Sequence, residues 1–217
     1  MSNDIYVHHR IACKPREWSA AAEEIIGAGA ARIATAGGSL YGLWRSQIGL
    51  PRDTITAVTL WLDTDTAIRM GDLLHDEMTS VETVELDLMT PTLRPETSAP
   101  PTRQGNYAFR WFETPPENFA EFLDLCDAAW PGFESSYDSQ VIGLWRVEAS
   151  DDGAIRTLLM TRRPDLAMWE RSKIPADTAE AEVRKTLSRR YDLCDWTNVY
   201  TTTLLTAEDT HDEVRWS

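Results

Sequence analysis

The tetrapeptide Gly42-Leu43-Trp44-Arg45 occurs a second time, as Gly143-Leu144-Trp145-Arg146, at an offset of 101 residues. Two further pairs of aromatic residues share this offset: Tyr6 with Tyr107, and Trp18 with Phe119. Three separated matches at one offset indicate an internal duplication, and a copy of about a hundred residues has the size of a domain. The sequence therefore predicts two like domains rather than a solenoid of short repeats.

The composition limits the class of protein. The 217 residues are 42% hydrophobic and carry a formal net charge of −14. Such a charge repels phosphate backbones and anionic lipid, so we expect neither nucleic acid nor membrane as a partner. The three cysteines, Cys13, Cys126 and Cys194, never form a Cys-x-x-Cys spacing, which is typical of reduced thiols. With no apolar leader or spanning run in the sequence, we expect a cytoplasmic protein.

The first copy follows the order β-α-β-β-α-β. Its strands are dense in β-formers, and its first helix shows apolar residues at helical spacing from Trp18 until Gly37-Gly38. The predicted elements are a strand at 5–12, a helix at 18–36, a hairpin of 39–48 with 54–62, a helix from about 64 to 78 and a strand at 81–89. This order is that of a ferredoxin-like unit.

The second copy repeats the order after a proline-rich segment. Residues 91–105 hold four prolines without periodicity, which predicts a linker over 92–105. The following elements are a strand at 106–112, a helix from 119, a hairpin of 137–148 with 154–161, helical pieces at 165–173 and 177–190, and a strand near 197–206. The predicted domains are therefore 1–91 and 106–206, followed by an acidic tail at 207–217.

Each such unit covers one face of its sheet with helices and leaves the other face bare. A bare apolar face needs a partner. We therefore expect an α+β fold in which the two units pack sheet to sheet, with the gap between the sheets as the ligand site.

The stretch Leu40-Tyr41-Gly42-Leu43-Trp44-Arg45-Ser46-Gln47-Ile48-Gly49, with Thr59-Leu60-Trp61 and Met89-Thr90-Pro91-Thr92, resembles the NIPSNAP family of the dimeric α/β barrel superfamily. The resemblance covers nearly all of residues 5–92 and, more weakly, 106–206. The family pattern has Glu where this chain has Gln47 and His where it has Thr59; the second copy has Glu148 and Thr157 at these positions. Relatives in the superfamily include cofactor-free monooxygenases, lyases, isomerases and haem proteins, which implies a ligand cavity between the sheets.

Strand alternation predicts which side chains face that cavity. We expect Leu40, Gly42 and Trp44 to pack beneath the helices. The residues predicted to bind substrate are Tyr41, Arg45, Gln47, Thr59, Trp61, Arg146 and Glu148. The resemblance places His9 where the family has an inward Arg, and the 101-residue offset pairs His9 with Arg110. These two are the predicted catalytic residues.

Two hypotheses of function follow. In the first, the chain is a cofactor-independent enzyme that abstracts a proton from a hydrophobic, aromatic or polyketide-like small molecule, in a lyase, isomerase or oxygenase reaction. His9 would be the general base and the arginines would hold the anion; the alternatives are a structural histidine and internal ion pairs, such as Arg146 with Glu148. In the second, the chain is a non-catalytic small-molecule-binding or protein-interaction module. We expect no metal site and no cofactor, with His75 a haem ligand only in principle, and a homo-oligomer is compatible with both.

Overall fold

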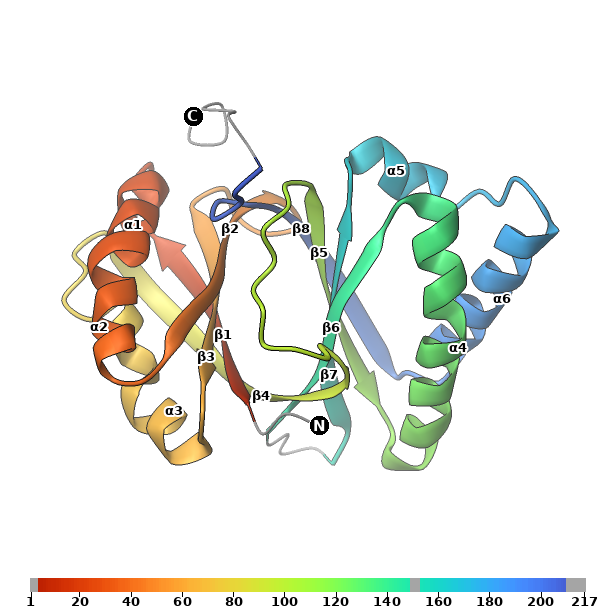
Figure 1. Cartoon of the computed structure of the whole chain (residues 1–217), viewed down its shortest axis with the longest axis horizontal. Coiled ribbons are helices and arrows are strands. Elements are labelled where there is room, and N and C mark those ends of the chain that lie inside the picture. The colour runs from red at the N-terminus through yellow and green to blue at the C-terminus, as the bar shows by residue number, and fades with distance from the viewer. Residues whose placement is uncertain (1–3, 149–152, 210–217) are drawn as a thin grey trace. The chain divides into compact units, whose positions relative to one another are not determined.

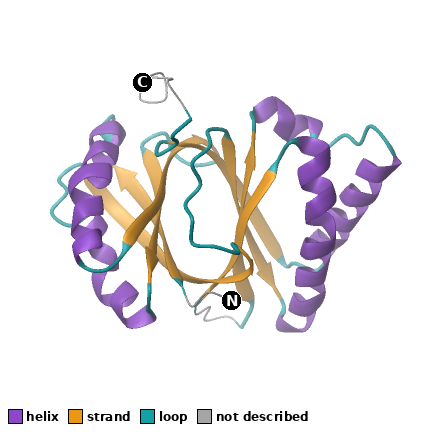
Figure 2. Cartoon of the chain, in the orientation of Figure 1, coloured by secondary structure: helices purple, strands orange, loops and turns teal. Residues whose placement is uncertain are grey.

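The computed structural model describes residues 4–148 and 153–209. Its strands hydrogen-bond in the order β1-β3-β2-β8-β5-β7-β6-β4, a closed antiparallel barrel (Figures 1 and 2). The α+β fold class is confirmed. Two compact units are present within the described residues: one comprises residues 4–91, 96–104 and 200–209, and the other residues 92–95, 105–148 and 153–199.

The first unit has the predicted β-α-β-β-α-β order. Its strands are β1 (Ile5–Cys13), β2 (Ser39–Ile48), β3 (Thr54–Trp61) and β4 (Val81–Arg94); its helices are α1 (Trp18–Glu24), a π-helical turn (Ile25–Gly29), α2 (Ala30–Thr35), α3 (Thr64–Met70) and a 3-10 turn (Gly71–Leu74). Asp63 caps α3 by accepting from the backbone N–H of Thr66 at 2.8 Å. Strand β4 continues to Arg94, into the segment predicted as linker.

The helices of this unit cover one face of its sheet, and the core lies between them (Figure 1). Trp18 and Ile25 of the helical layer pack in one cluster with Ile11, Leu43 and Trp61 of the strands. The prediction that Trp61 faces away from the helices was wrong.

A β-bulge in β2 explains why the side chains that point toward the helices were predicted wrongly. Leu40 lies opposite Thr59, but Gly42 lies opposite Val58, so one extra residue enters the strand between them. Leu40 and Leu43, three residues apart, therefore both pack against the helix-covered core. Gly42 and Trp44 lie on the other face, contrary to prediction.

Side-chain packing explains why each copy of the tetrapeptide begins with glycine. A Cβ atom on Gly42 would overlap the indole of Trp44, and one on Gly143 would overlap the indole of Trp145. Both tryptophans are fully buried. Glycine is thus needed in each copy because the tryptophan two residues later covers its Cα.

The second unit is built in the same order, with an additional helix. Its strands are β5 (Asn106–Thr114), β6 (Gln140–Val147), β7 (Ile155–Arg163) and β8 (Trp196–Leu204), and its helices are a 3-10 turn (Pro116–Asn118), α4 (Phe119–Tyr137), α5 (Leu166–Arg171) and α6 (Thr178–Asp192). Asp177 caps α6 as its sequence predicts, accepting from the N–H of Glu180 at 2.8 Å. Part of the predicted acidic tail, residues 210–217, lies outside the described residues.

The final strand divides between the two units. Its residues from Tyr200 onward belong to the first unit, where Leu204 lies opposite Trp44 of β2. Fully buried His8 of β1 holds this segment: its Nε2 is 2.9 Å from the Tyr200 hydroxyl and its Nδ1 is 3.0 Å from Asp87 Oδ2. Of the helices described, none is long and apolar enough to cross a membrane.

Candidate functional site

Three predicted site residues meet in the first unit, on the helix-covered face. His9 Nε2 lies 3.0 Å from Thr59 Oγ1, and Trp61 Nε1 donates to the same oxygen at 2.9 Å. All three side chains are buried. Burial, reinforced by the neighbouring His75 and His8, holds the pKa of His9 well below its usual range. His9 is therefore neutral near pH 7, and its Nε2 is already engaged, which favours the structural alternative for this residue.

Other predicted residues of the first unit lie apart from this group. Tyr41 makes an edge contact with Tyr6, with ring centroids 5.2 Å apart. Arg45 stacks on the ring of Trp18 at 4.3 Å. Gln47 is exposed near the end of β2. The structure does not bring these three side chains together with His9.

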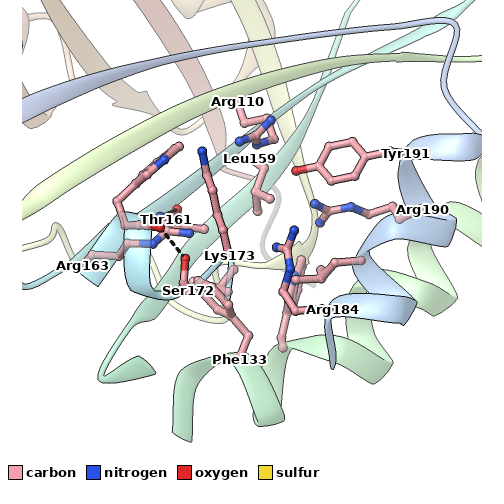
Figure 3. Close-up of a pocket in the computed structure, with 14 residues that line it drawn as sticks. Arg110, Phe133, Leu159, Thr161, Arg163, Ser172, Lys173, Arg184, Arg190 and Tyr191 are labelled. Atoms are coloured by element: carbon pink, nitrogen blue, oxygen red, sulfur yellow. Dashed lines mark hydrogen bonds between the residues drawn. The ribbon is translucent and has the colours of Figure 1, made fainter. Parts of the chain in front are cut away.

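In the second unit, Arg110 lines a pocket between the sheet and helices α4 to α6 (Figure 3). The space measures about 620 Å³ including its open mouth. Its lining consists of Arg110, Trp130, Phe133, Val141, Leu159, Thr161, Arg163, Trp169, Ser172, Lys173, Arg184, Leu187, Arg190 and Tyr191. Arg146 and Glu148 are exposed elsewhere and do not line it.

The lining is strongly cationic. It holds four arginines and a lysine, and no Asp or Glu, in a protein whose net charge is −14. Within the described ranges, none of the five cations forms an ion pair. Three carboxylates of helices α4 and α6 are engaged with other arginines: Glu121 with Arg189 at 3.0 Å, Glu134 with Arg94 at 2.7 Å, and Glu180 with Arg171 at 2.6 Å.

Two of these arginines are held in an unfavourable environment. Burial lowers the pKa of Arg163 to about 10, and the charge of Arg110 adds to the effect. Burial, with smaller effects from Arg190 and Arg184, also lowers the pKa of Arg110. Both guanidinium groups stay charged at neutral pH. A desolvated charge without a counter-ion lowers the free energy of unfolding by roughly several kcal/mol. An anion bound between the two arginines would offset this cost, so the arrangement indicates an anion site.

Aromatic rings offset part of that cost. The guanidinium of Arg163 lies 4.3 Å from the ring centroid of Trp169, the guanidinium of Arg110 lies 5.9 Å from it, and the ammonium of Lys173 lies 5.7 Å from it. Such cation–π contacts stabilise by about 0.5 to 2 kcal/mol each. They attract the cations to Trp169 without neutralising them, which leaves their charge available to a ligand.

The two copies carry different residues at corresponding positions of their third strands, β3 and β7. Strand pairing sets His9 opposite Ala57 and Arg110 opposite Leu159, so the offset on the third strand of each copy is 102 residues. The counterpart of Thr59 is then Thr161, not Thr157 as predicted from a shorter turn. Likewise, the counterpart of Trp61 is Arg163, which donates to Thr161 Oγ1 at 3.1 Å.

Several pocket residues were missed by the sequence analysis. Trp169, Ser172 and Lys173 come from the segment by which the second copy is longer, a feature that the sequence shows. Arg184, Leu187 and Tyr191 follow the i, i+3, i+7 spacing of one helical face on α6. The presence of a cation, an apolar residue and an aromatic residue on one face of this helix was the feature of the sequence that could have indicated the pocket.

No family model matches this chain, and no curated protein matches it significantly. Solved structures do. An anthrone oxidase-like protein aligns with a TM-score of 0.61 and 13% identity over 94% of each chain. A chlorite dismutase variant from Candidatus Nitrospira defluvii aligns with a TM-score of 0.62 and 5% identity, over 94% of this chain and 92% of that one. A proposed monooxygenase from Lactobacillus acidophilus aligns with a TM-score of 0.57 and 8% identity, over 94% and 97%.

The chain has the dimeric α/β barrel fold. At these identities the likeness establishes the fold alone, because a fold hosts many functions.

Proposed function

We propose that this dimeric α/β barrel protein binds a small, hydrophobic organic anion in the pocket of its second unit. One observation carries the proposal: five cationic side chains line an aromatic cavity that contributes no carboxylate of its own. Sites for organic ligands combine an apolar lining with a few polar groups that fix orientation, and a guanidinium is suited to bind a carboxylate through two parallel hydrogen bonds.

The lining indicates the chemistry of the ligand. Trp130, Phe133 and Trp169 supply aromatic surface, and Leu159 and Leu187 supply aliphatic surface. A planar ring with an acidic oxygen matches both parts of the lining: the ring contacts the aromatic walls, and a carboxylate, phenolate or enolate oxygen accepts from the arginines. This agrees with the aromatic or polyketide-like class expected from the sequence.

Catalysis at this pocket is the second candidate function. Cations fixed before the reaction stabilise a negative charge that develops on a substrate oxygen. A carbon acid bound there would lose its proton to water, and the electrons of the broken C–H bond would move onto the oxygen near Arg110 and Arg163. Lyase, isomerase and cofactor-free oxygenase reactions can share this first step. His9 belongs to the other unit, so we assign the proton acceptor to solvent.

The family, compartment and oligomeric state expected from the sequence are compatible with this proposal. Kinship with the NIPSNAP family is supported by the resemblance of residues 40–49, 59–61 and 89–92 to the family pattern, and a small-molecule binder of that kind is compatible with a cytoplasmic homo-oligomer.

The test of binding compares 2-naphthoate with its neutral isostere 2-naphthamide by isothermal titration calorimetry. We expect the anion to bind at least about tenfold more tightly, since charge-assisted hydrogen bonds are about twice as strong as neutral ones. Arg110→Ala should remove that difference, whereas the exposed Arg146→Ala should keep it. Equal affinities for the acid and the amide in the unaltered protein would refute the proposal.

The test of catalysis follows hydrogen–deuterium exchange by proton NMR at the acidic carbon of a bound β-ketoacid ester or anthrone in D2O. We expect exchange to be faster with the protein than without it, and Arg110→Ala to restore the background rate. If 2-naphthoate binds but exchange stays at background, the protein is a binding module only.

A further inference from the structure

We infer that the ligand of the second unit's pocket is a compact dianion: an aromatic molecule whose two negative charges lie on one group or on adjacent groups. The inference rests on the proposed function and specifies its ligand. It follows from how the cations of the pocket are placed relative to one another.

The arginines form one cluster rather than separate binding points. Arg110 and Arg163 stand over the same ring of Trp169, at 5.9 and 4.3 Å from its centroid. Arg184 acts electrostatically on both of them. Figure 3 shows Arg110, Arg184 and Arg190 directed toward a common space beside the Tyr191 ring. The cluster therefore converges on one volume.

Burial strengthens the mutual repulsion within this cluster. Arg163 is only 9% exposed, and its Nε atom lacks a hydrogen-bond partner within the described residues. Arg190 is 3% exposed, but its guanidinium donates to Cys126 Sγ at 3.6 Å, and Cys126 and Tyr191 raise its pKa. The uncompensated repulsion therefore centres on Arg110 and Arg163, whose pKa values are lowered. Like charges in a medium of low dielectric constant repel more strongly than in water. A monoanion would neutralise one of five positive charges and leave most of the repulsion in place. A dianion accepts more hydrogen bonds and relieves more of the repulsion.

The geometry also limits how far apart the two negative charges can be. Because the guanidinium groups of Arg110 and Arg163 lie 5.9 and 4.3 Å from the centroid of one indole ring and act electrostatically on each other, a ligand that contacts both must present its charges close together. A phosphate monoester does this on one group, and a vicinal aromatic dicarboxylate does it on neighbouring groups. Dicarboxylates with charges at opposite ends of a ring system do not fit this arrangement.

The rest of the chain does not provide a general attraction for anions. The net charge of −14 disfavours their adsorption on the surface. A preference for dianions would therefore report on the pocket itself, which makes the inference testable with matched probes.

The first experiment measures the affinities of 2-naphthyl phosphate and its methyl diester by calorimetry at pH 7.5. The two probes share a ring and a phosphate but differ by one charge. We expect the monoester to bind at least about tenfold more tightly. Its affinity should fall by about five- to tenfold between pH 7 and pH 5, since the second ionisation of a phosphate monoester lies near pH 6. The diester, a monoanion throughout, should show no such change.

The protein side of that pH profile is simple. Among the described residues, the lining holds no His, Asp, Glu or Cys. The charged or titratable side chains that face the ligand are Arg110 of β5, Arg163 of β7, Lys173 after α5, and Arg184, Arg190 and Tyr191 of α6. A pH dependence seen for the monoester but not the diester then belongs to the ligand.

The second experiment varies the cluster and the spacing of the charges. Arg184→Gln should reduce the monoester affinity toward that of the diester, with Arg146→Gln as the exposed control. Naphthalene-2,3-dicarboxylate should bind more tightly than naphthalene-2,6-dicarboxylate, and the two have the same charge and composition.

The outcomes separate this inference from the proposed function. If 2-naphthoate binds but the phosphate monoester and diester have equal affinity, the dianion inference is wrong and the anion pocket stands. If the 2,6-dicarboxylate binds as well as the 2,3-isomer, the ligand is not compact and the inference is also wrong. If none of these anions binds, both proposals fail.

Discussion

Trp61 and Arg163 occupy corresponding positions in the two copies, and each donates a hydrogen bond to a threonine hydroxyl two residues earlier on its strand, at 2.9 and 3.1 Å. In the first copy the donor is an uncharged indole, and it is buried beside His9 and Thr59. In the second copy the donor is a desolvated guanidinium that lines a pocket. The duplication has kept the hydrogen bond and changed what surrounds it.

Arg163→Met should stabilise the protein while it weakens anion binding. Arg163 is nine-tenths buried and forms no ion pair with any described carboxylate, so its replacement by an apolar side chain of similar length removes a desolvated charge. We expect the free energy of unfolding to rise by about 1 to 3 kcal/mol in urea titrations, even after the loss of two cation–π contacts and of the hydrogen bond to Thr161. The exposed Arg146→Met should change it by less than about 0.5 kcal/mol. A clear loss of stability in Arg163→Met would show that the charge is compensated in the free protein.

The fold could be predicted because the duplication and the β-α-β-β-α-β order depend on local patterns. Which face of a strand packs against the helices could not be predicted, because β2 carries buried apolar side chains on both faces. Leu43 points toward the helices and Trp44 points away from them. Alternation alone does not say which face is which. The bulge after Leu40 then reverses the alternation within the strand, and bulges leave little trace in sequence.

The site found in the structure differs from the predicted one. The repeat offset paired Arg110 with His9, as a residue expected to face the gap between the sheets; Arg110 lines the pocket of the second unit beneath its helices. Arg163 was missed because the third strands were aligned through a shorter turn, Thr59 with Thr157, whereas strand pairing gives an offset of 102 residues. Lys173 was missed because the segment that carries it has no counterpart in the first copy.

Gly143→Ala should destabilise the protein markedly. The added methyl group would overlap the indole of Trp145, which is fully buried. Overpacking of this kind costs about 1 to 3 kcal/mol, and Gly42→Ala should behave alike because Trp44 covers it in the same way. Thermal and urea denaturation measure the loss.

The matched control for the glycine variants is Gly27→Ala. Gly27 lies in the helical layer, and a Cβ atom there would meet nothing within 4 Å. Alanine at this helical site should leave stability unchanged or raise it by up to about 1 kcal/mol. Equal effects at residues 27 and 143 would contradict the role given to the tetrapeptide glycines.

His9 should make the protein less stable as the pH falls. Its folded-state pKa lies well below its unfolded value near 6.5, so the unfolded chain takes up a proton first. Stability is then full above about pH 6.5 and declines below it, by at most about 1.4 kcal/mol per pH unit for this residue. Burial also lowers the pKa of His75, so His75 adds to the same decline.

Urea titrations between pH 7.5 and 5 test this dependence. His9→Gln should flatten the profile below pH 6.5, and His75→Gln should flatten it less because His75 is less buried. A His9→Gln profile parallel to that of the unaltered protein would mean that His9 takes up its proton equally in the folded and unfolded chains.

Tyr200→Phe should weaken the attachment of the last strand to the first unit. Asp87 can only accept a hydrogen bond, so Nδ1 of His8 is the donor to it, and Nε2 is left to accept from the Tyr200 hydroxyl. Removing that hydroxyl leaves a buried ring nitrogen without its partner, at a cost of about 1 to 3 kcal/mol. Amide hydrogen exchange at 201–204 should accelerate. A double-mutant cycle with His8→Leu isolates the contact from the other neighbours of Tyr200; a coupling energy near zero would show that the hydrogen bond does not hold the strand.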